Sequence, residues 1–228
     1  MLRDFHFGGY PYHLTGRLAS PSWMRHLCSM NLSAELTVSK TLQALILTPN
    51  LINLRLDKMV GEHEVIHRPR ISDPNFLPLV SFPKLAHLYV GISATLAPLR
   101  VLLDRLCIPP ACSMVISAHS IQVEEIARKK ILAPIIHAIS TCARSHFAYH
   151  IPHRVRLTIK KRYFMFETAT YSDNPTFKLW LELPPRPVFP THTLTMLLNH
   201  LSLPGLSQAT IFYTRVNGVN IHAADSGA

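Results

Sequence analysis

Three histidines close together form the most recognisable pattern of possible metal ligands in the chain. His146, His150 and His153 occur in the segment SHFAYHIPH, and the spacing of four between the first two would place both imidazoles on one face of a helix. No acidic residue lies nearby to complete a ligand set, and Pro152 would end the helix. We therefore expect ordinary surface histidines near a helix end, and no metal ion.

Two other pairs have the chemistry of ligands or acid–base groups. Cys107 and Cys112 flank an Ile-Pro-Pro segment, but no second pair completes a zinc site, so the pattern favours core cysteines. Glu124 and Glu125 are adjacent and would lie on different sides of a helix, where they favour its positively charged start. The sequence also lacks a phosphate-binding glycine loop, a serine elbow and an HExxH element, so we predict no enzyme, no catalytic residue and no cofactor.

The charge of the chain is strongly positive. There are 23 Lys and Arg against 13 Asp and Glu, a formal net charge of +10. Much of the excess lies in one part of the sequence, which we call the basic band: Arg128, Lys129, Lys130, Arg144, Arg154, Arg156, Lys160, Lys161 and Arg162. Such a band can attract nucleic acid or acidic proteins, although a solvated surface without a partner is the more ordinary interpretation. Nucleic-acid binding stays open as an alternative function.

The hydrophobic pattern gives no sign of a membrane protein. The most apolar segment, Ile131 to Ile139, is too short to span a bilayer and contains Pro134 and His137. The first residues lack the apolar core of a secretory signal, so the four cysteines are expected to be reduced. We expect a cytoplasmic or nuclear protein that makes no contact with a membrane.

Two segments carry the LxxLxL spacing of a leucine-rich-repeat strand. Leu51, Leu54 and Leu56 provide it in the segment Asn50 to Asp57, and Leu85, Leu88 and Val90 repeat it. A weaker version is expected at Met24, Leu27 and Met30. The first two copies are 34 residues apart, beyond the usual repeat of about 20 to 29 residues, because a polar loop, Gly61 to Asn75, separates them.

Helical periodicity alternates with these strands. We expect a helix capped by Ser39 and stopped by Pro49, and a second from about Thr95 to Pro109. Two more are expected, from about Ile121 to His146, kinked or split at Pro134, and from Thr193 to Leu201. Further strands are expected in these segments: Cys112 to Ser117, 153–161, 162–171, 176–183 and Gln208 to Thr214.

The order of elements predicts an α/β fold. Helix and strand alternate along the chain, which favours a mainly parallel sheet joined by helical crossovers, with a possible hairpin near 162–183. With the LxxLxL segments, this order predicts an irregular leucine-rich-repeat solenoid. We expect one domain over 21–216, a poorly structured leader over 1–20 and a frayed tail over 217–228.

The residues between the inward leucines are candidates for a partner-binding surface. Side chains alternate between the two faces of a strand, so nine residues should share one face: Asn53, Arg55, His87, Tyr89, Arg154, Arg156, Lys178, Trp180 and Glu182. Tyr, Trp and Arg dominate the energetics of protein interfaces. Trp180 has two equal interpretations, an exposed anchor for a partner or a side chain packed against a neighbouring hairpin.

Several passages together resemble a known family. The passages PSWMRHL, SKTLQALILTPNLINLRL, LVSFPKLAHLYVG and LLDRLCIPPACSMVIS are similar to the leucine-rich-repeat region of the F-box proteins expanded in mushroom-forming fungi. The similarity covers Pro21 to Ser117 well and the remainder only in the order of its elements. Two features depart from the family: the sequence contains no F-box, and Met59 and Ser93 stand where the asparagine after LxxLxL usually occurs.

The resemblance implies a role in ubiquitin transfer. A member of this family would be the substrate receptor of a cullin-type ubiquitin ligase, gripping a target protein with its repeats. An F-box upstream of the repeats would dock on a Skp-type adaptor. The expected function is therefore a non-enzymatic protein-binding module for an unknown target, with nucleic-acid binding or a truncated relative without independent function as the alternatives.

Overall fold

The structure is a computed structural model of the 228-residue chain. It describes residues 3–8, 22–33, 35–59, 77–122, 129–150, 152, 154–160, 162–169, 175–183 and 210–214. The expected helix Thr193 to Leu201, the loop Gly61 to Asn75 and the tail 217–228 lie outside these residues.

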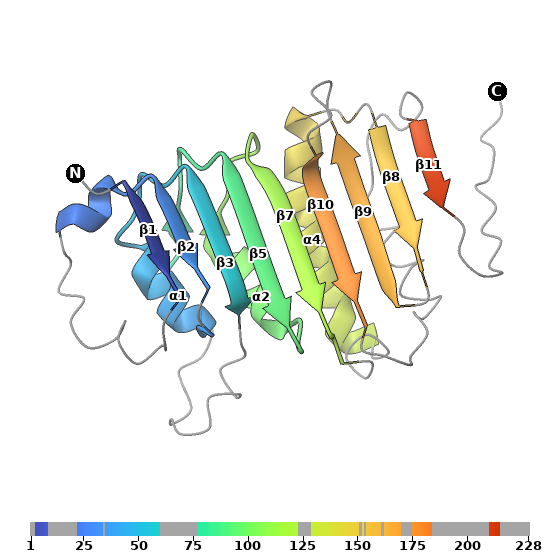
Figure 1. Ribbon diagram of the computed structural model, residues 1–228, viewed down its shortest axis with the longest axis horizontal. Coiled ribbons are helices and arrows are strands. Elements are labelled where there is room, and N and C mark those ends of the chain that lie inside the picture. Colours follow the sequence, from blue (N-terminus) through green and yellow to red (C-terminus); the bar gives the residue numbers. More distant parts are fainter. Residues whose placement is uncertain are drawn as a thin grey trace.

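A nine-stranded sheet extends through the whole described molecule (Figure 1). Its strands, in spatial order, are β1 (Asp4–Phe7), β2 (Ser29–Leu32), β3 (Asn53–Met59), β5 (His87–Ser93), β7 (Ser113–His119), β10 (Pro175–Glu182), β9 (Tyr163–Ala169), β8 (Arg154–Ile159) and β11 (Thr210–Thr214). The first six are parallel to one another, β9 is antiparallel to both β10 and β8, and β11 is parallel to β8. The mainly parallel α/β sheet and the hairpin near 162–183 are thus confirmed.

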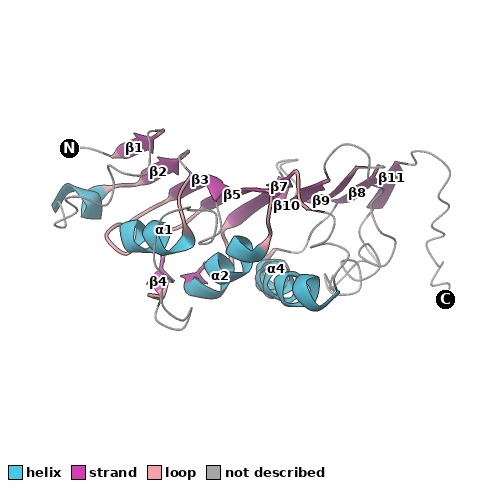
Figure 2. Cartoon of the chain, turned by 90° about the horizontal axis from the view of Figure 1, so that it is seen from below, coloured by secondary structure: helices cyan, strands magenta, loops and turns pink. Residues whose placement is uncertain are grey.

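The three α-helices of the described residues lie on one face of this sheet (Figure 2). They are α1 (Val38–Leu45), α2 (Ala97–Arg105) and α4 (Lys129–Tyr149), and a short 3₁₀ helix spans Ser22–His26. A small second sheet on the helical side pairs β4 (Val80–Ser81) with β6 (Leu106–Cys107). Among the described residues, no helix covers the opposite face, which we call the open face.

Alternating side chains bury one face of each strand against the helices. In β3, Leu54 and Leu56 are buried while Asn53 and Arg55 are exposed. Equivalent apolar residues from Met24 to Leu183 form one continuous core. Each buried aliphatic or aromatic side chain contributes roughly 1.5–3 kcal/mol to folding, so this layer holds the helices on the sheet.

The parallel strands start with the same hydrogen-bond pattern. The Arg3 carbonyl accepts from the amides of Cys28 and Ser29, the Cys28 carbonyl from those of Ile52 and Asn53, and the Ile52 carbonyl from those of Ala86 and His87. The Ala86 carbonyl accepts from the Ser113 amide. The four accepting residues, Arg3, Cys28, Ile52 and Ala86, follow one another at intervals of 25, 24 and 34 residues. This pattern fixes the register of neighbouring strands.

The structure differs from the expected leader at Asp4–Phe7. These residues form β1, which pairs with β2 in parallel register, Phe5 opposite Met30 and Phe7 opposite Leu32. Phe5 and Phe7 pack against the core, and Phe5 also contacts Trp23 with ring centroids 5.5 Å apart. These four residues form a strand because they pair with β2. So short a segment has too little periodicity to be predicted as a strand from its own sequence.

The start of helix α1 needs correction. It is capped by Thr37, whose hydroxyl accepts a hydrogen bond from the Lys40 amide, and not by Ser39, which is buried inside the first turn. Of the two effects expected of Pro134, a split of helix α4 is wrong, because that residue lies within one helix of 21 residues, whereas a kink stays a prediction. Since the proline is in the second turn, it removes only one hydrogen bond near the helix start. Within the described ranges, no helix combines the length and the apolar character that a bilayer crossing requires.

Candidate binding surface on the open face

The open face brings most of the predicted partner-binding residues into adjacent positions. Across β3 and β5, Asn53 pairs with His87 and Arg55 with Tyr89. Four more predicted residues lie on β10 and β8. On β10, Lys178 is opposite Val115 of β7 and Glu167 of β9, Trp180 is opposite Ser117 of β7, and Glu182 is opposite Tyr163 of β9. On β8, Arg156 is opposite Glu167. Arg154 stands two positions before Arg156, in register with Ala169 and Thr210. The nine residues therefore come from four strands of one sheet.

A pocket of about 290 Å³ lies on this face over β2, β3, β5 and β7. Its lining is formed by Ser29, Met30, Asn31, Asn53, Leu54, Arg55, His87, Leu88, Tyr89, Ser113 and Val115. Four of these, Asn53, Arg55, His87 and Tyr89, belong to the predicted set. We call this cavity the Arg55 pocket.

The sequence interpretation missed Ser29 and Asn31 because it placed the first repeat three residues too early. Register pairs Met30 with Leu54 and Leu32 with Leu56. The LxxLxL positions of that repeat are therefore Leu27, Met30 and Leu32, not Met24, Leu27 and Met30. When the pattern is aligned on Leu27, Met30 and Leu32, Ser29 and Asn31 lie between apolar positions, as Asn53 and Arg55 do in β3. This spacing was the signal that could have identified them.

Arg55 is held in place by two neighbours. Its Nε donates a hydrogen bond to Asp57 Oδ2 at 2.8 Å, and its Cζ lies 4.2 Å from the centre of the Tyr89 ring. The hydrogen bond to Asp57 raises the pKa of Arg55, with burial opposing it and the charges of Asp57 and Tyr89 adding to it. The side chain is still 52% exposed. A guanidinium stacked on an aromatic ring keeps its planar donors oriented for a ligand.

Trp180 lies on the open face and also packs against the neighbouring hairpin. Its ring stacks on Tyr163 of β9, with centroids 5.4 Å apart and an angle of 26° between planes. Lys178 Nζ is 5.6 Å from the Trp180 ring. The indole is half-buried, and among the described residues its Nε1 has no hydrogen-bond partner. The packing of Trp180 against the hairpin is thus observed, and its role as an anchor for a partner stays a prediction.

A serine, a histidine and a carboxylate are linked beside Trp180. His119 Nδ1 lies 3.0 Å from Glu182 Oε2, and Ser117 Oγ lies 2.7 Å from His119 Nε2. Arg162 also contacts Glu182, at 3.6 Å. Because the carboxylate keeps the proton on Nδ1, the serine hydroxyl donates to Nε2, which is the bonding order of an acyl-transfer triad.

Access to the serine of this group is restricted. Ser117 is only 6% exposed and lies within β7, between the ladders to β5 and β10. Acyl transfer also needs donors that face the oxyanion, and the β7 backbone is occupied by these two ladders. Ser117 and His119 on β7 are thus connected to Glu182 on β10, and Glu182 to Arg162, the residue before β9. Sequence spacing could indicate Ser117 and His119 on one face, but Glu182 is brought to them only by sheet pairing.

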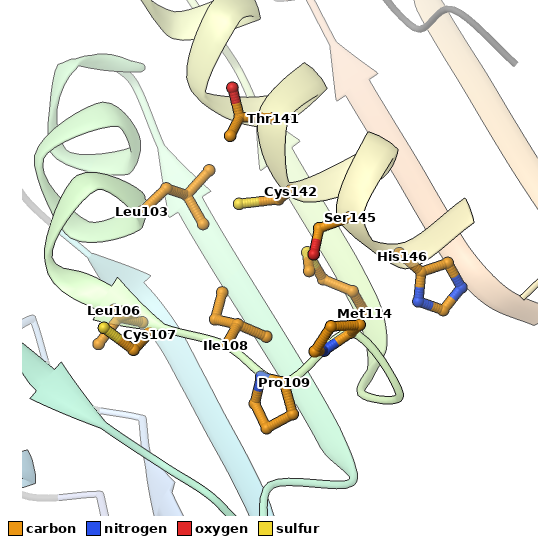
Figure 3. A pocket seen from close by; sticks show the side chains of 11 residues that line it. Leu103, Leu106, Cys107, Ile108, Pro109, Met114, Thr141, Cys142, Ser145 and His146 are labelled. Atoms are coloured by element: carbon orange, nitrogen blue, oxygen red, sulfur yellow. The ribbon is translucent and has the colours of Figure 1, made fainter. Parts of the chain in front are cut away.

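A second pocket, of about 240 Å³, lies on the helical side between α2, α4 and the segment before β7 (Figure 3). Its lining is mostly apolar and includes Leu103, Ile108 and Met114, with Cys142 and His146 from α4. Burial raises the pKa of Cys142 to about 11, with the charge of Asp104 adding to the effect. Burial also raises the pKa of Cys112 to about 12, against a hydrogen bond to the Leu88 backbone that lowers it. Both thiols are therefore protonated at neutral pH and are poor ligands and nucleophiles.

His146 is not a surface histidine, contrary to expectation. It is 1% exposed, and its Nδ1 donates a hydrogen bond to the Cys112 carbonyl at 3.0 Å. His150 is oriented toward the same segment, with Nε2 3.2 Å from the Ala111 carbonyl. In the described part of the chain, no group of three or more His, Cys, Asp or Glu side chains is arranged to hold a metal ion. His153 lies outside that part.

The described members of the basic band lie on two sides of the sheet. Arg144 is exposed on α4, on the helical side, whereas Arg156 lies on the open face and contacts Glu167 at 3.7 Å. Arg162 contacts Glu182 at 3.6 Å, and Lys160 Nζ lies 5.0 Å from the centre of the Tyr163 ring. Among these residues, Arg156, Lys160 and Arg162 therefore lie near β9, and the two arginines are paired with carboxylates.

No protein-family model, curated protein or solved structure matches the chain. A proposal for its function must therefore depend on the geometry and chemistry of the open face.

Proposed function

We propose that this chain is a non-enzymatic protein-binding module that holds a target protein on its open face. The observation that carries the proposal is the Arg55 pocket, a cavity on the face of the sheet that no described helix covers, lined by a Tyr, an Arg, a His and amide side chains. Tyr and Arg are the residue types that contribute most to protein interfaces. The strand ladders hold these residues in place before a partner binds.

The repeat architecture belongs to the same proposal. The intervals of 25, 24 and 34 residues between equivalent carbonyls lie in or near the range of about 20 to 29 residues of leucine-rich repeats. Parallel strands in matching register support an irregular solenoid in which each strand is one unit. By resemblance, the module would be the substrate-recognition part of an F-box ubiquitin-ligase receptor. An F-box joined to it would supply the contact with a Skp-type adaptor.

Nucleic-acid binding is the less favoured alternative. It requires lysines and arginines that are free to contact a phosphate backbone, whereas Arg156 and Arg162 already contact Glu167 and Glu182, and Arg144 lies on the helical side of the sheet. Filter binding of single-stranded RNA and duplex DNA at low and high salt tests it. Retention at low salt that falls steeply with added salt would favour this alternative over a protein target.

Two substitutions test the proposed face. Tyr89→Ala and Trp180→Ala should each weaken binding of a partner isolated with the wild-type chain by roughly 1–3 kcal/mol, because each removes a large interface side chain. Tyr149→Ala is the matched control, since Tyr149 is 65% exposed and lies on α4, on the helical side. Titration calorimetry measures the affinities and circular dichroism checks folding. Equal affinity of wild type, Tyr89→Ala and Trp180→Ala would exclude the open face.

The non-enzymatic part of the proposal has its own test. A fluorophosphonate probe reacts with serine nucleophiles activated by a histidine. We expect no labelling of the wild-type chain, because Ser117 is 6% exposed and lies within a strand. Labelling that disappears in Ser117→Ala would instead identify Ser117, His119 and Glu182 as a working triad.

A further inference from the structure

We propose that the Arg55 pocket binds a carboxylate side chain of an acidic, extended segment of the target protein. This inference rests on the proposed function, because it names the chemistry of the partner at the same face.

The guanidinium of Arg55 is already positioned for such a ligand. Asp57 binds its Nε edge at 2.8 Å and the Tyr89 ring covers one side at 4.2 Å. Nε is thereby occupied, and the outer nitrogens belong to a side chain that is 52% exposed and lines the pocket. A planar guanidinium pairs with a carboxylate through two parallel hydrogen bonds, which gives both strength and orientation.

The charge around the pocket favours an acidic ligand. None of the residues that line it is Asp or Glu, and Arg55 is its one Lys or Arg. Asp57 contacts Arg55 but lies outside the lining. The whole chain carries a formal net charge of +10, which attracts an acidic partner over a distance. Asp57 compensates part of the charge of Arg55, so the preference for an acidic segment depends on the free outer edge of the guanidinium and on the positive charge of the whole chain.

A second observation points to the backbone of the bound segment. Asn31 lines the pocket next to Arg55, its neighbour in the β2–β3 register. Its Oδ1 is buried and, among the described residues, has no hydrogen-bond partner. An unsatisfied buried acceptor is costly, and rotation of the Asn31 amide would bring this oxygen to the pocket, where a peptide N–H of a bound segment would satisfy it. Arg55 would then hold the acidic side chain while Asn31 holds the main chain.

The experiment selects short random peptides displayed on phage against the immobilised full-length chain. The selected peptides should be enriched in Asp and Glu compared with the starting library. A synthetic copy of the most enriched peptide, labelled with fluorescein, is then titrated with each protein variant. Arg55→Gln should weaken its binding about tenfold or more, because a charge-assisted pair is lost. Arg55→Lys keeps the charge but loses the planar fork, so it should restore binding only in part.

Arg100→Gln is the matched control. Arg100 is 52% exposed and contacts a carboxylate, Asp104, as Arg55 is 52% exposed and contacts Asp57. It lies on α2, on the helical side of the sheet and away from the Arg55 pocket. The substitution removes the same charge and should leave binding within about twofold of wild type, since exposed ion pairs contribute little.

The outcomes separate this inference from the proposed function. Acidic peptides that lose affinity in Arg55→Gln and keep it in Arg100→Gln support both. Selected peptides without acidic enrichment that still lose binding in Tyr89→Ala overturn the carboxylate inference and leave the proposed function standing. Binding that is insensitive to Tyr89→Ala, Trp180→Ala and Arg55→Gln overturns both. Displacement of the peptide by polyuridine RNA, with the same dependence on Arg55, would assign the pocket to phosphate and also overturn the inference.

Discussion

His146 connects helix α4 to the segment before β7 through a buried hydrogen bond to the Cys112 carbonyl. Its ring also lies within 6.0 Å of the ring centres of Phe147, His150 and Phe177. Burial, with a smaller effect from His150, lowers the pKa of His146 to about 4, although the carbonyls of Cys112 and Pro110 oppose the shift. The imidazole is therefore neutral at physiological pH, and protonation would place a charge in the core.

We expect the stability of the fold to decrease in acid because of this residue. Above pH 6.5, the usual pKa of histidine, His146 is neutral in both the folded and the unfolded chain and carries no penalty. As the pH falls below 6.5, the unfolded chain takes up the proton first, so the free energy of unfolding decreases. The decrease continues until the pH reaches about 4, the pKa of His146 in the folded chain. The full loss is on the order of 3 kcal/mol. Urea unfolding between pH 7 and pH 4 measures it.

Two variants separate His146 from the other groups that titrate in this range. His146→Gln keeps a donor for the Cys112 carbonyl but cannot be protonated, so its stability should decrease less in acid than that of wild type. His137→Gln, on the exposed side of the same helix, is the control and should follow the wild-type slope. Parallel slopes for wild type and His146→Gln would show that His146 does not cause the decrease.

At the scale of the elements, two parallel strands, β5 and β7, are each followed by a residue that has a positive φ although it is not glycine. Ala94 and Ser120 directly follow β5 and β7, with φ of 68° and 53°, and the residues before them, Ser93 and His119, are paired in register. Lys58, with φ of 56°, lies in β3 at the shift in register between Leu56 and Met59. These conformations cost L-residues roughly 1–2 kcal/mol each, and the sheet ladders hold the chain in them.

Ala94→Gly should therefore stabilise the fold by about 1 kcal/mol, because glycine adopts positive φ without a steric cost. Ala86→Gly is the matched control. Ala86 precedes β5 and lies outside the left-handed region, so Ala86→Gly should decrease the free energy of unfolding by about 0.5–1 kcal/mol. Thermal unfolding of both variants measures the two changes. Destabilisation of similar size at both positions would contradict the conformational explanation.

At the scale of the whole molecule, one core joins the parallel strands to the antiparallel hairpin. Phe147 of α4 contacts Phe166 of β9 and Phe177 of β10, with ring centroids 6.3 and 5.3 Å apart. The same core continues to Met24 beneath the first strands. A continuous core favours one cooperative unfolding transition over separate melting of the two ends.

The two tryptophans of the chain test this cooperativity from its two sides. Trp23 packs near β1, and Trp180 lies on β10. Trp180→Phe leaves Trp23 as the fluorescent reporter, and Trp23→Phe leaves Trp180. In each variant, urea curves from fluorescence and from circular dichroism should coincide. A Trp23 signal that changes before the circular dichroism would show that the first strands unfold separately, as the one-dimensional coupling of repeat proteins allows.

The sequence by itself determined the class of fold and the orientation of many residues of the open face. Alternation of apolar and polar residues has a period of two in a strand, so it assigns a face to each residue from its neighbours alone. For this reason Leu54 and Leu56 were predicted inside, and Asn53 and Arg55 outside. The hairpin was also predictable, because both of its strands and their turn are close in sequence.

Only the tertiary structure decided which of these residues meet. The Arg55 pocket combines β2, β3, β5 and β7, whose relative register depends on backbone hydrogen bonds between segments far apart in sequence. The burial of His146 depends on the segment that packs over the end of α4, and the link from His119 to Glu182 depends on the pairing of β7 with β10. Periodicity records which way a side chain points, whereas contact requires the register of distant segments, and local sequence does not encode that register.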